Sequence, residues 1–128
     1  MSETTPCPCG SGLEYTACCE PYISGKMRAP GPEALMRSRY TAYTLGNSAY
    51  LRQTWHPSTC PAELDFSAPQ PRWISLSVIS ARQSSVSSAD VEFVARFRVG
   101  GRAQRLHETS RFELVNERWY YLDGEIHS

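Results

Sequence analysis

The sequence has almost no lysine, no long apolar run and no excess of charge of either sign. Lys26 is the single lysine among 13 basic residues, which balance 13 acidic residues to a formal net charge of +0. A neutral chain is only weakly attracted to phosphate backbones, so we do not expect a nucleic-acid partner. No apolar stretch approaches the ~20 residues that a membrane helix needs, so we expect no membrane span.

The start of the chain also lacks a secretion signal. Residues 1–6 are polar and contain neither the basic nor the apolar region that such a signal requires. We therefore expect a cytoplasmic protein, in which thiols stay reduced. A chain of 128 residues, of which 41% are hydrophobic, is sufficient for one compact domain with a small appendage.

What the chain does have is a dense group of cysteines near its start. Because Gly10 and Gly12 can adopt backbone angles closed to other residues, the chain between the cysteines can fold back on itself. Four thiolates would then surround one Zn²⁺ tetrahedrally and leave no open position for water, so we predict a single structural zinc site. Its ligands are four of the five cysteines: Cys7, Cys9, Cys18 and Cys19.

Two disulfides or a redox pair are the alternative interpretations of these cysteines. A reducing compartment disfavours disulfides, and neither cysteine pair has the C-x-x-C spacing of a redox site. The cysteine-rich stretch has few apolar residues, so metal binding would supply its folding free energy. We expect metal removal to unfold residues 1–21 and to leave the rest folded. Cys60 is the spare thiol, and we expect it to be idle.

The spacing from Cys7 to Cys19 resembles the SEC-C motif. This small zinc-binding module is also found at the C-terminus of the bacterial translocation ATPase SecA. The match includes the Gly-Ser-Gly turn, the aromatic Tyr15 and the closing cysteine pair. The resemblance implies a zinc knuckle that binds a protein partner. SEC-C tails that bind partners are usually rich in lysine between the cysteine pairs, and residues 13–17 contain none. The partner chemistry of those lysine-rich tails is therefore not implied here.

Two helices are expected in the middle of the chain. An apolar stripe runs through residues 33–45, and Gly46 is a typical stop signal after it. Ser48 is expected to cap a shorter helix over residues 49–55. The proline-rich stretch 58–72 predicts a loop that contains one helical turn.

From Trp73 onward, apolar and polar residues alternate with a period of two, which is typical of half-buried strands. The Gly100-Gly101 pair is a strong hairpin signal between two of them. We predict an α+β fold in which the helices pack on one face of a four-stranded antiparallel meander. The expected strands cover residues 73–82, 91–99, 103–115 and 119–122.

Several longer segments resemble the bacterial YchJ family: residues 36–43, 54–59, 107–112 and 119–124. That family joins an N-terminal SEC-C motif to a cone-like domain of the nuclear transport factor 2/cystatin-like type, in which a curved sheet wraps around N-terminal helices. The resemblance implies a SEC-C knuckle over residues 1–24 and a cone-like domain over residues 25–128. Such cones often leave a pocket between helix and sheet.

Strict alternation along the third strand turns Glu108 and Ser110 inward, toward the helices. An inward polar pair is costly unless it is hydrogen-bonded or lines a wet pocket. Two interpretations remain open. Glu108 is either the acid or base of a ligand pocket, or the partner of Arg37 or Arg39 in a structural ion pair. A one-residue bulge would instead turn Glu108 outward and His107 inward.

The leading hypothesis is a zinc-binding accessory protein, whose knuckle binds a protein partner and whose cone holds a small ligand. The alternative is an enzyme of unknown reaction with Glu108 as its acid or base carboxylate. His56 is the second catalytic candidate, although its place at a helix end also suits capping or stacking on Trp55. The residues expected to line the pocket are Arg39, Tyr40, Trp55, His56, Glu108, Ser110 and Asp123.

Overall fold

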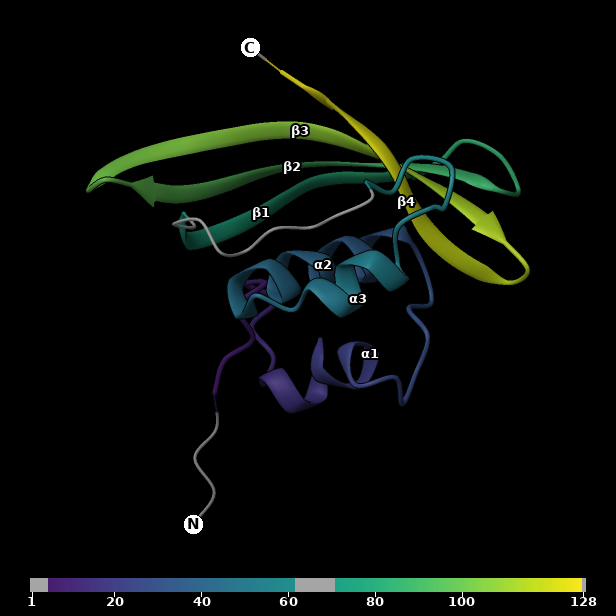
Figure 1. Ribbon diagram of the computed structural model, residues 1–128, viewed down its shortest axis with the longest axis horizontal. Coiled ribbons are helices and arrows are strands. Elements are labelled where there is room, and N and C mark those ends of the chain that lie inside the picture. Colours follow the sequence, from purple (N-terminus) through teal and green to yellow (C-terminus); the bar gives the residue numbers. More distant parts are fainter. Residues whose placement is uncertain (1–4, 62–70, 128) are drawn as a thin grey trace.

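Helices occupy the first half of the chain and strands the second. The computed structural model describes residues 5–61 and 71–127. All helices lie on one side of the curved sheet (Figure 1), so the predicted α+β arrangement is confirmed. The elements are a 3₁₀ turn over Tyr15–Ala17, α1 (Glu20–Ile23), α2 (Pro32–Leu45), α3 (Ser48–Gln53), β1 (Arg72–Gln83), β2 (Ser88–Val99), β3 (Arg102–Val115) and β4 (Arg118–Ile126).

The four strands form an antiparallel meander in the order β1-β2-β3-β4, as predicted. Asn116 and Glu117 both take positive φ between β3 and β4, and this turn geometry matches the right-handed twist of the flanking strands. All four strands are longer than the alternation predicted, and β2 and β4 exceed the prediction most. β2 begins at Ser88 and β4 continues to Ile126, because ladder hydrogen bonds to β3 extend past the last alternating apolar residues.

The two main helices begin and end at local signals. Pro32 opens α2, and Gly46 ends it in the left-handed conformation with φ of 69°. The cap of α3 is Asn47 and not Ser48, because Ser48 is already the first helical residue. The side chain of Asn47 accepts a hydrogen bond from the backbone N–H of Tyr50 at 3.0 Å. The helical turn expected around residues 62–64 lies outside the described residues.

One apolar core joins the cysteine turn to the helices and the sheet. Figure 1 shows α2 between the sheet and the N-terminal segment that contains α1. The division at residue 24 stays a prediction about folding, since the cysteines pack directly on the cone. Buried members of this core include Cys7, Cys9, Cys19, Leu35, Met36, Tyr40, Leu76, Phe93 and Trp119.

Within residues 5–61 and 71–127, every helix is too short or too polar to span a bilayer. The longest, α2, spans 14 residues and carries charged side chains such as Arg37 and Arg39.

Candidate metal centre and cone pocket

The four N-terminal cysteines converge on one point. Their sulfur atoms all lie within 4.8 Å of one another, and all four are free thiols. The Sγ atoms of Cys9 and Cys18 are 3.6 Å apart, and those of Cys18 and Cys19 are 3.9 Å apart. Four sulfur atoms around a tetrahedral ion with metal–sulfur bonds of 2.3 Å would be separated by roughly 3.8 Å. The cluster therefore has the donor set and the spacing to bind a metal.

Two glycines fold the chain back, as the sequence predicted. Gly10 and Gly12 have φ of 77° and 88°, values that other residues rarely adopt. The turn is closed by the backbone N–H of Cys7, which donates to the carbonyl of Leu13 at 2.9 Å. Gly10 also lies close to β1, since a Cβ there would come within 3.2 Å of the carbonyl oxygen of Leu76. The cysteine turn is thus built against the sheet.

Helix α2 supplies polar contacts to the cluster from two residues one turn apart. Arg37 Nη1 donates to the carbonyl of Cys9 at 2.9 Å and lies 3.9 Å from its sulfur. Thr41 Oγ1 donates to Cys19 Sγ at 3.4 Å and lies 3.7 Å from Cys7 Sγ. Such outer contacts orient metal ligands and tune their basicity. Sequence reasoning did not predict that either residue contacts the cysteines. The signal that could have indicated it was the i,i+4 spacing of two polar residues, which places Arg37 and Thr41 on the same face of the helix.

The thiols share their protons unevenly. The Cys9 sulfur accepts a hydrogen bond from the Cys19 thiol, which lowers the pKa of Cys9 to about 4 despite its burial. The same hydrogen bond and burial raise the pKa of the Cys19 thiol. Burial also raises the pKa of Cys18, although the Ser11 hydroxyl 3.1 Å from its sulfur opposes that shift. The hydrogen bonding within the cluster therefore favours the thiolate at Cys9 over the thiolate at Cys19.

A second site lies between α2 and the inner face of the sheet. It is a cavity of about 270 Å³ with mainly apolar walls and three polar groups. Ser110 Oγ donates to Glu108 Oε2 at 2.6 Å, so both side chains point inward, as strict alternation along β3 predicted. The aromatic walls are Tyr40, Tyr43, Trp73, Phe93, Phe112 and Tyr121.

The third polar group is the buried guanidinium of Arg39. Its Nη1 donates to the carbonyl of Leu51 at 2.8 Å and to Thr54 Oγ1 at 2.7 Å. Its central carbon lies 4.9 Å from the ring centroid of Trp55 and 4.5 Å from that of Tyr121. Burial lowers the pKa of this guanidinium. Among the described residues, hydrogen bonds and ring faces stabilise the charge in place of a carboxylate.

The alternative prediction, a structural ion pair between an arginine of α2 and Glu108 of the sheet, is wrong. Arg37 pairs with Glu33 on its own helix, with Nε and Oε2 3.0 Å apart. Within residues 5–61 and 71–127, neither Arg37 nor Arg39 lies within ion-pair distance of Glu108. α2 is fixed on the sheet by apolar and aromatic contacts instead, such as the edge-on contact of Tyr40 with Trp73.

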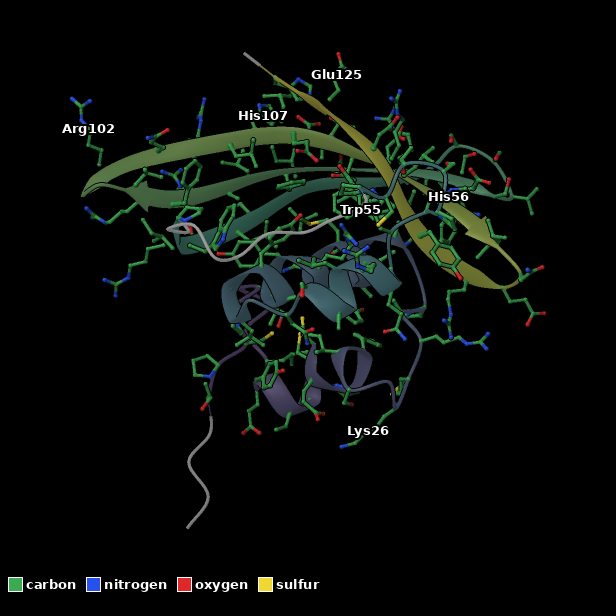
Figure 2. All side chains as sticks on the ribbon, viewed as in Figure 1. Lys26, Trp55, His56, Arg102, His107 and Glu125 are labelled. Atoms are coloured by element: carbon green, nitrogen blue, oxygen red, sulfur yellow. The ribbon has the colours of Figure 1, made fainter. Side chains whose placement is uncertain are left out.

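Four of the seven residues expected in the pocket line the cavity: Arg39, Tyr40, Glu108 and Ser110. Trp55 (labelled in Figure 2) lies against the guanidinium of Arg39 and packs edge-on against Tyr121. His56 lies outside the cavity, with Nε2 3.7 Å from Glu113 Oε1.

Asp123 is on the opposite face of the sheet because of a bulge in β4. Arg111 pairs with Asp123 and Phe112 pairs with Tyr121, so Leu122 is an extra residue in the ladder. The extra residue keeps Tyr121 inward and turns Asp123 outward. There its carboxylate accepts two hydrogen bonds from Arg111, at 2.5 and 2.9 Å. Alternation alone would have placed Tyr121 and Asp123 on the same face.

Comparisons with known proteins agree with both halves of the structure. A family model described as the middle NTF2-like domain of YchJ matches residues 31–124, and the SEC-C motif matches residues 4–21. The chain belongs to the YchJ family. The fold expected from the resemblance, an N-terminal SEC-C knuckle followed by an NTF2-like cone, is thereby confirmed.

Similar YchJ-family proteins come from several bacteria. A UPF0225 protein of Cupriavidus pinatubonensis is 55% identical over 130 residues, which cover 95% of this chain and 89% of that protein. One from Ralstonia nicotianae is 50% identical, with 96% and 92% covered. The solution structure of a SEC-C motif containing protein from Rhodopseudomonas palustris has a TM-score of 0.85 and 38% identity, covering 95% of this chain and 98% of the other. A crystal structure of a SEC-C motif containing protein from Psychrobacter arcticus has a TM-score of 0.80 and 31% identity, covering 98% and 84%.

Proposed function

We propose that this YchJ-family protein is a zinc-stabilised accessory protein that binds a small aromatic carboxylate in its cone and a protein partner through its knuckle. The observation that carries the ligand class is Arg39, a guanidinium that is 5% exposed and lines an aromatic cavity without a carboxylate partner among the described residues. A buried charge is stabilised most by an opposite charge, so a ligand carboxylate would complete the site.

The aromatic walls and Glu108 restrict the ligand further. A flat apolar ring packs well against aromatic side chains such as Phe93 and Phe112, which line the cavity. Glu108 already accepts a hydrogen bond from Ser110, so a ligand hydroxyl or amine near it would complete its hydrogen bonding. The cavity of about 270 Å³ limits the ligand to one or two rings.

The ligand proposal is tested with benzoate and its neutral analogue benzamide, added to the zinc-loaded protein and followed by amide NMR. We expect benzoate to shift the amides of α2 and β3 around the cavity, and benzamide to bind at least about tenfold more weakly. The variant Arg39→Met should remove the preference for benzoate. Equal binding of both compounds would show that Arg39 does not select an anion.

The alternative function is an enzyme with Glu108 as its acid or base. Among the described residues that line the cavity, Glu108 is the only carboxylic acid, and no histidine accompanies it. A general acid or base commonly acts with a second positioned proton carrier, so this arrangement favours binding over catalysis. Turnover of a bound aromatic carboxylate that Glu108→Gln abolishes, with binding retained, would establish the enzyme instead.

For the metal, we propose one structural Zn²⁺ on Cys7, Cys9, Cys18 and Cys19. Four sulfur ligands suit Zn²⁺ and leave no open coordination position. Metal analysis of the dialysed protein should give one tightly bound zinc per chain, and the double variant Cys7→Ser/Cys18→Ser should retain none that is tightly bound. Cys60→Ser is the matched control and should retain the zinc. A native protein without zinc would refute this assignment.

The knuckle also offers a surface for a protein partner. Leu13 is 54% exposed, and next to it a shallow groove is lined by Ala17, Cys18 and the first turns of α2. A photo-crosslinking residue at position 13 should capture a partner only when zinc is bound. The matched position is Val86, which is 84% exposed in the β1–β2 turn. Equal capture from both positions would contradict a docking role for the knuckle.

A further inference from the structure

A second group of metal-ligand side chains lies on the outer face of the sheet, opposite the helices. Glu92 of β2, His107 of β3 and His127 just after β4 bring their donor atoms within 4.8 Å of one another. Figure 2 shows His107 and Glu125 on the side of the sheet away from α2. This group shares no residue with the cysteine cluster or with the cone cavity.

The strand register brings the three side chains together. The backbone N–H of His127 donates to the carbonyl of His107 at 2.8 Å, which continues the β3–β4 ladder beyond Ile126. The two imidazole rings stack with centroids 4.2 Å apart and planes 20° apart. On the other side, Val94 is paired with His107, so Glu92 lies diagonally across from it on the same face. There His107 Nε2 and Glu92 Oε2 are 2.7 Å apart.

We propose that Glu92, His107 and His127 form a second divalent transition-metal site, of the two-histidine, one-carboxylate type. Imidazole and carboxylate ligands together suit Zn²⁺ and its neighbours in the first transition series. Ligand atoms of a tetrahedral Zn²⁺ with bonds near 2.0–2.1 Å are roughly 3.4 Å apart. That separation lies between the 2.7 Å of the closest donor pair and the 4.8 Å limit of the group. Rotation of the stacked imidazole rings would aim both nitrogens at one ion.

Neighbouring groups on the same face suit such a site. Thr109 Oγ1 lies 2.7 Å from His127 Nε2 and holds that ring in place. Glu125 is paired with Thr109 in the ladder and adds negative charge nearby. The side chains of His107 and Glu92 are 28% and 32% exposed, so water can reach the ion. Three protein ligands leave one position open for water or for a ligand from a partner.

The test uses full-length protein with one Zn²⁺ already on the cysteines, titrated with further Zn²⁺ by calorimetry. We expect a second equivalent to bind and to shift the imidazole ¹⁵N signals of His107 and His127. His107→Gln and Glu92→Gln should each weaken this second event about tenfold or more. His127 is exposed, so His127→Gln removes no core contact and should fold normally. It should weaken the second binding event similarly.

The third histidine of the chain supplies the matched control. His56 lies beside Glu113, away from the group, so His56→Gln should leave the second event unchanged within about twofold. An equal loss in His56→Gln and His107→Gln would reveal unspecific histidine binding and overturn the proposal. Absence of a second event at millimolar Zn²⁺ would overturn it as well, and the group would then be an ordinary hydrogen-bonded cluster.

Discussion

The carboxylate of Glu108 lies directly over the α-carbon of Gly124 on the neighbouring strand. A Cβ built on Gly124 would come within 2.7 Å of the carboxyl carbon of Glu108. Gly124 is paired with Ser110, whose hydroxyl holds the same carboxylate. The missing side chain at position 124 therefore makes room for Glu108 on the inner face, and the cavity geometry depends on both strands.

Gly124→Ala should displace the Glu108 carboxylate and destabilise the fold by about 1 kcal/mol, since the added methyl meets only the end of the Glu108 side chain, which has to shift. Urea unfolding measures the effect. Gly31→Ala is the matched control, because nothing lies within 4 Å of a Cβ there. Adding Glu108→Ala to Gly124→Ala should recover much of the loss. Additive effects of the two substitutions would show that they do not touch.

Thr41→Val should weaken metal binding by about 10–100-fold, because it removes the hydroxyl that contacts Cys19 and Cys7 and keeps the shape of the side chain. Competition with a chromophoric chelator measures the affinity. Thr44→Val serves as the control, since the hydroxyl of Thr44 donates only to the carbonyl of Thr41 on the same helix. Unchanged affinity in Thr41→Val would mean that the hydroxyl does not act on the ligands.

Metal removal should affect the whole chain and not only the knuckle. Cys9 and Cys19 belong to the same buried core as Leu35 and Leu76, so freeing the cysteine turn exposes part of that core. We expect a chelator in reducing buffer to lower the melting temperature of the sheet and to shift β1 amides near Leu76. This differs from the expectation drawn from the sequence alone, that only residues 1–21 unfold. Amide shifts confined to those residues would support the simpler expectation.

Stability should fall steeply at high pH. Burial raises the pKa of Tyr40 and of Tyr121 to about 12 each, whereas an unfolded tyrosine titrates near 10. Between these values the unfolded state holds fewer protons than the folded state, so the free energy of unfolding decreases as pH rises. The contribution of these two tyrosines to the free energy of unfolding is fully present below pH ~10 and is lost by pH ~12. Denaturant titrations across that window should show the slope, and Tyr121→Phe should reduce it. An unchanged slope in that variant would rule out Tyr121 as a contributor.

Asn47→Ala should destabilise the protein by about 1 kcal/mol, because it removes the acceptor for the backbone N–H of Tyr50 at the start of α3. Thermal unfolding measures the loss. Ser48→Ala is the matched control and should have little effect, since Ser48 is already inside the helix. The opposite ranking of the two variants would restore Ser48 as the cap.

The features determined by the sequence alone are those that depend on residues close together in the chain. The cysteine turn needs only its two glycines and its spacing. α2 is bounded by Pro32 and Gly46, and the inward direction of Glu108 follows from a two-residue period along one strand. Each of these signals acts over a few residues, which is why they could be recognised without the fold.

The tertiary structure decided everything that depends on pairing between distant segments. The extra residue Leu122 in the ladder turned Asp123 outward, and no local pattern announces such a bulge. Hydrogen bonds to β3 carried β4 past its last alternating residues, which brought His127 opposite His107. Packing of α2 against the cysteines placed Thr41 beside their sulfur atoms. Ladder register and helix docking are set by many weak contacts acting together, and these contacts exist only in the folded chain.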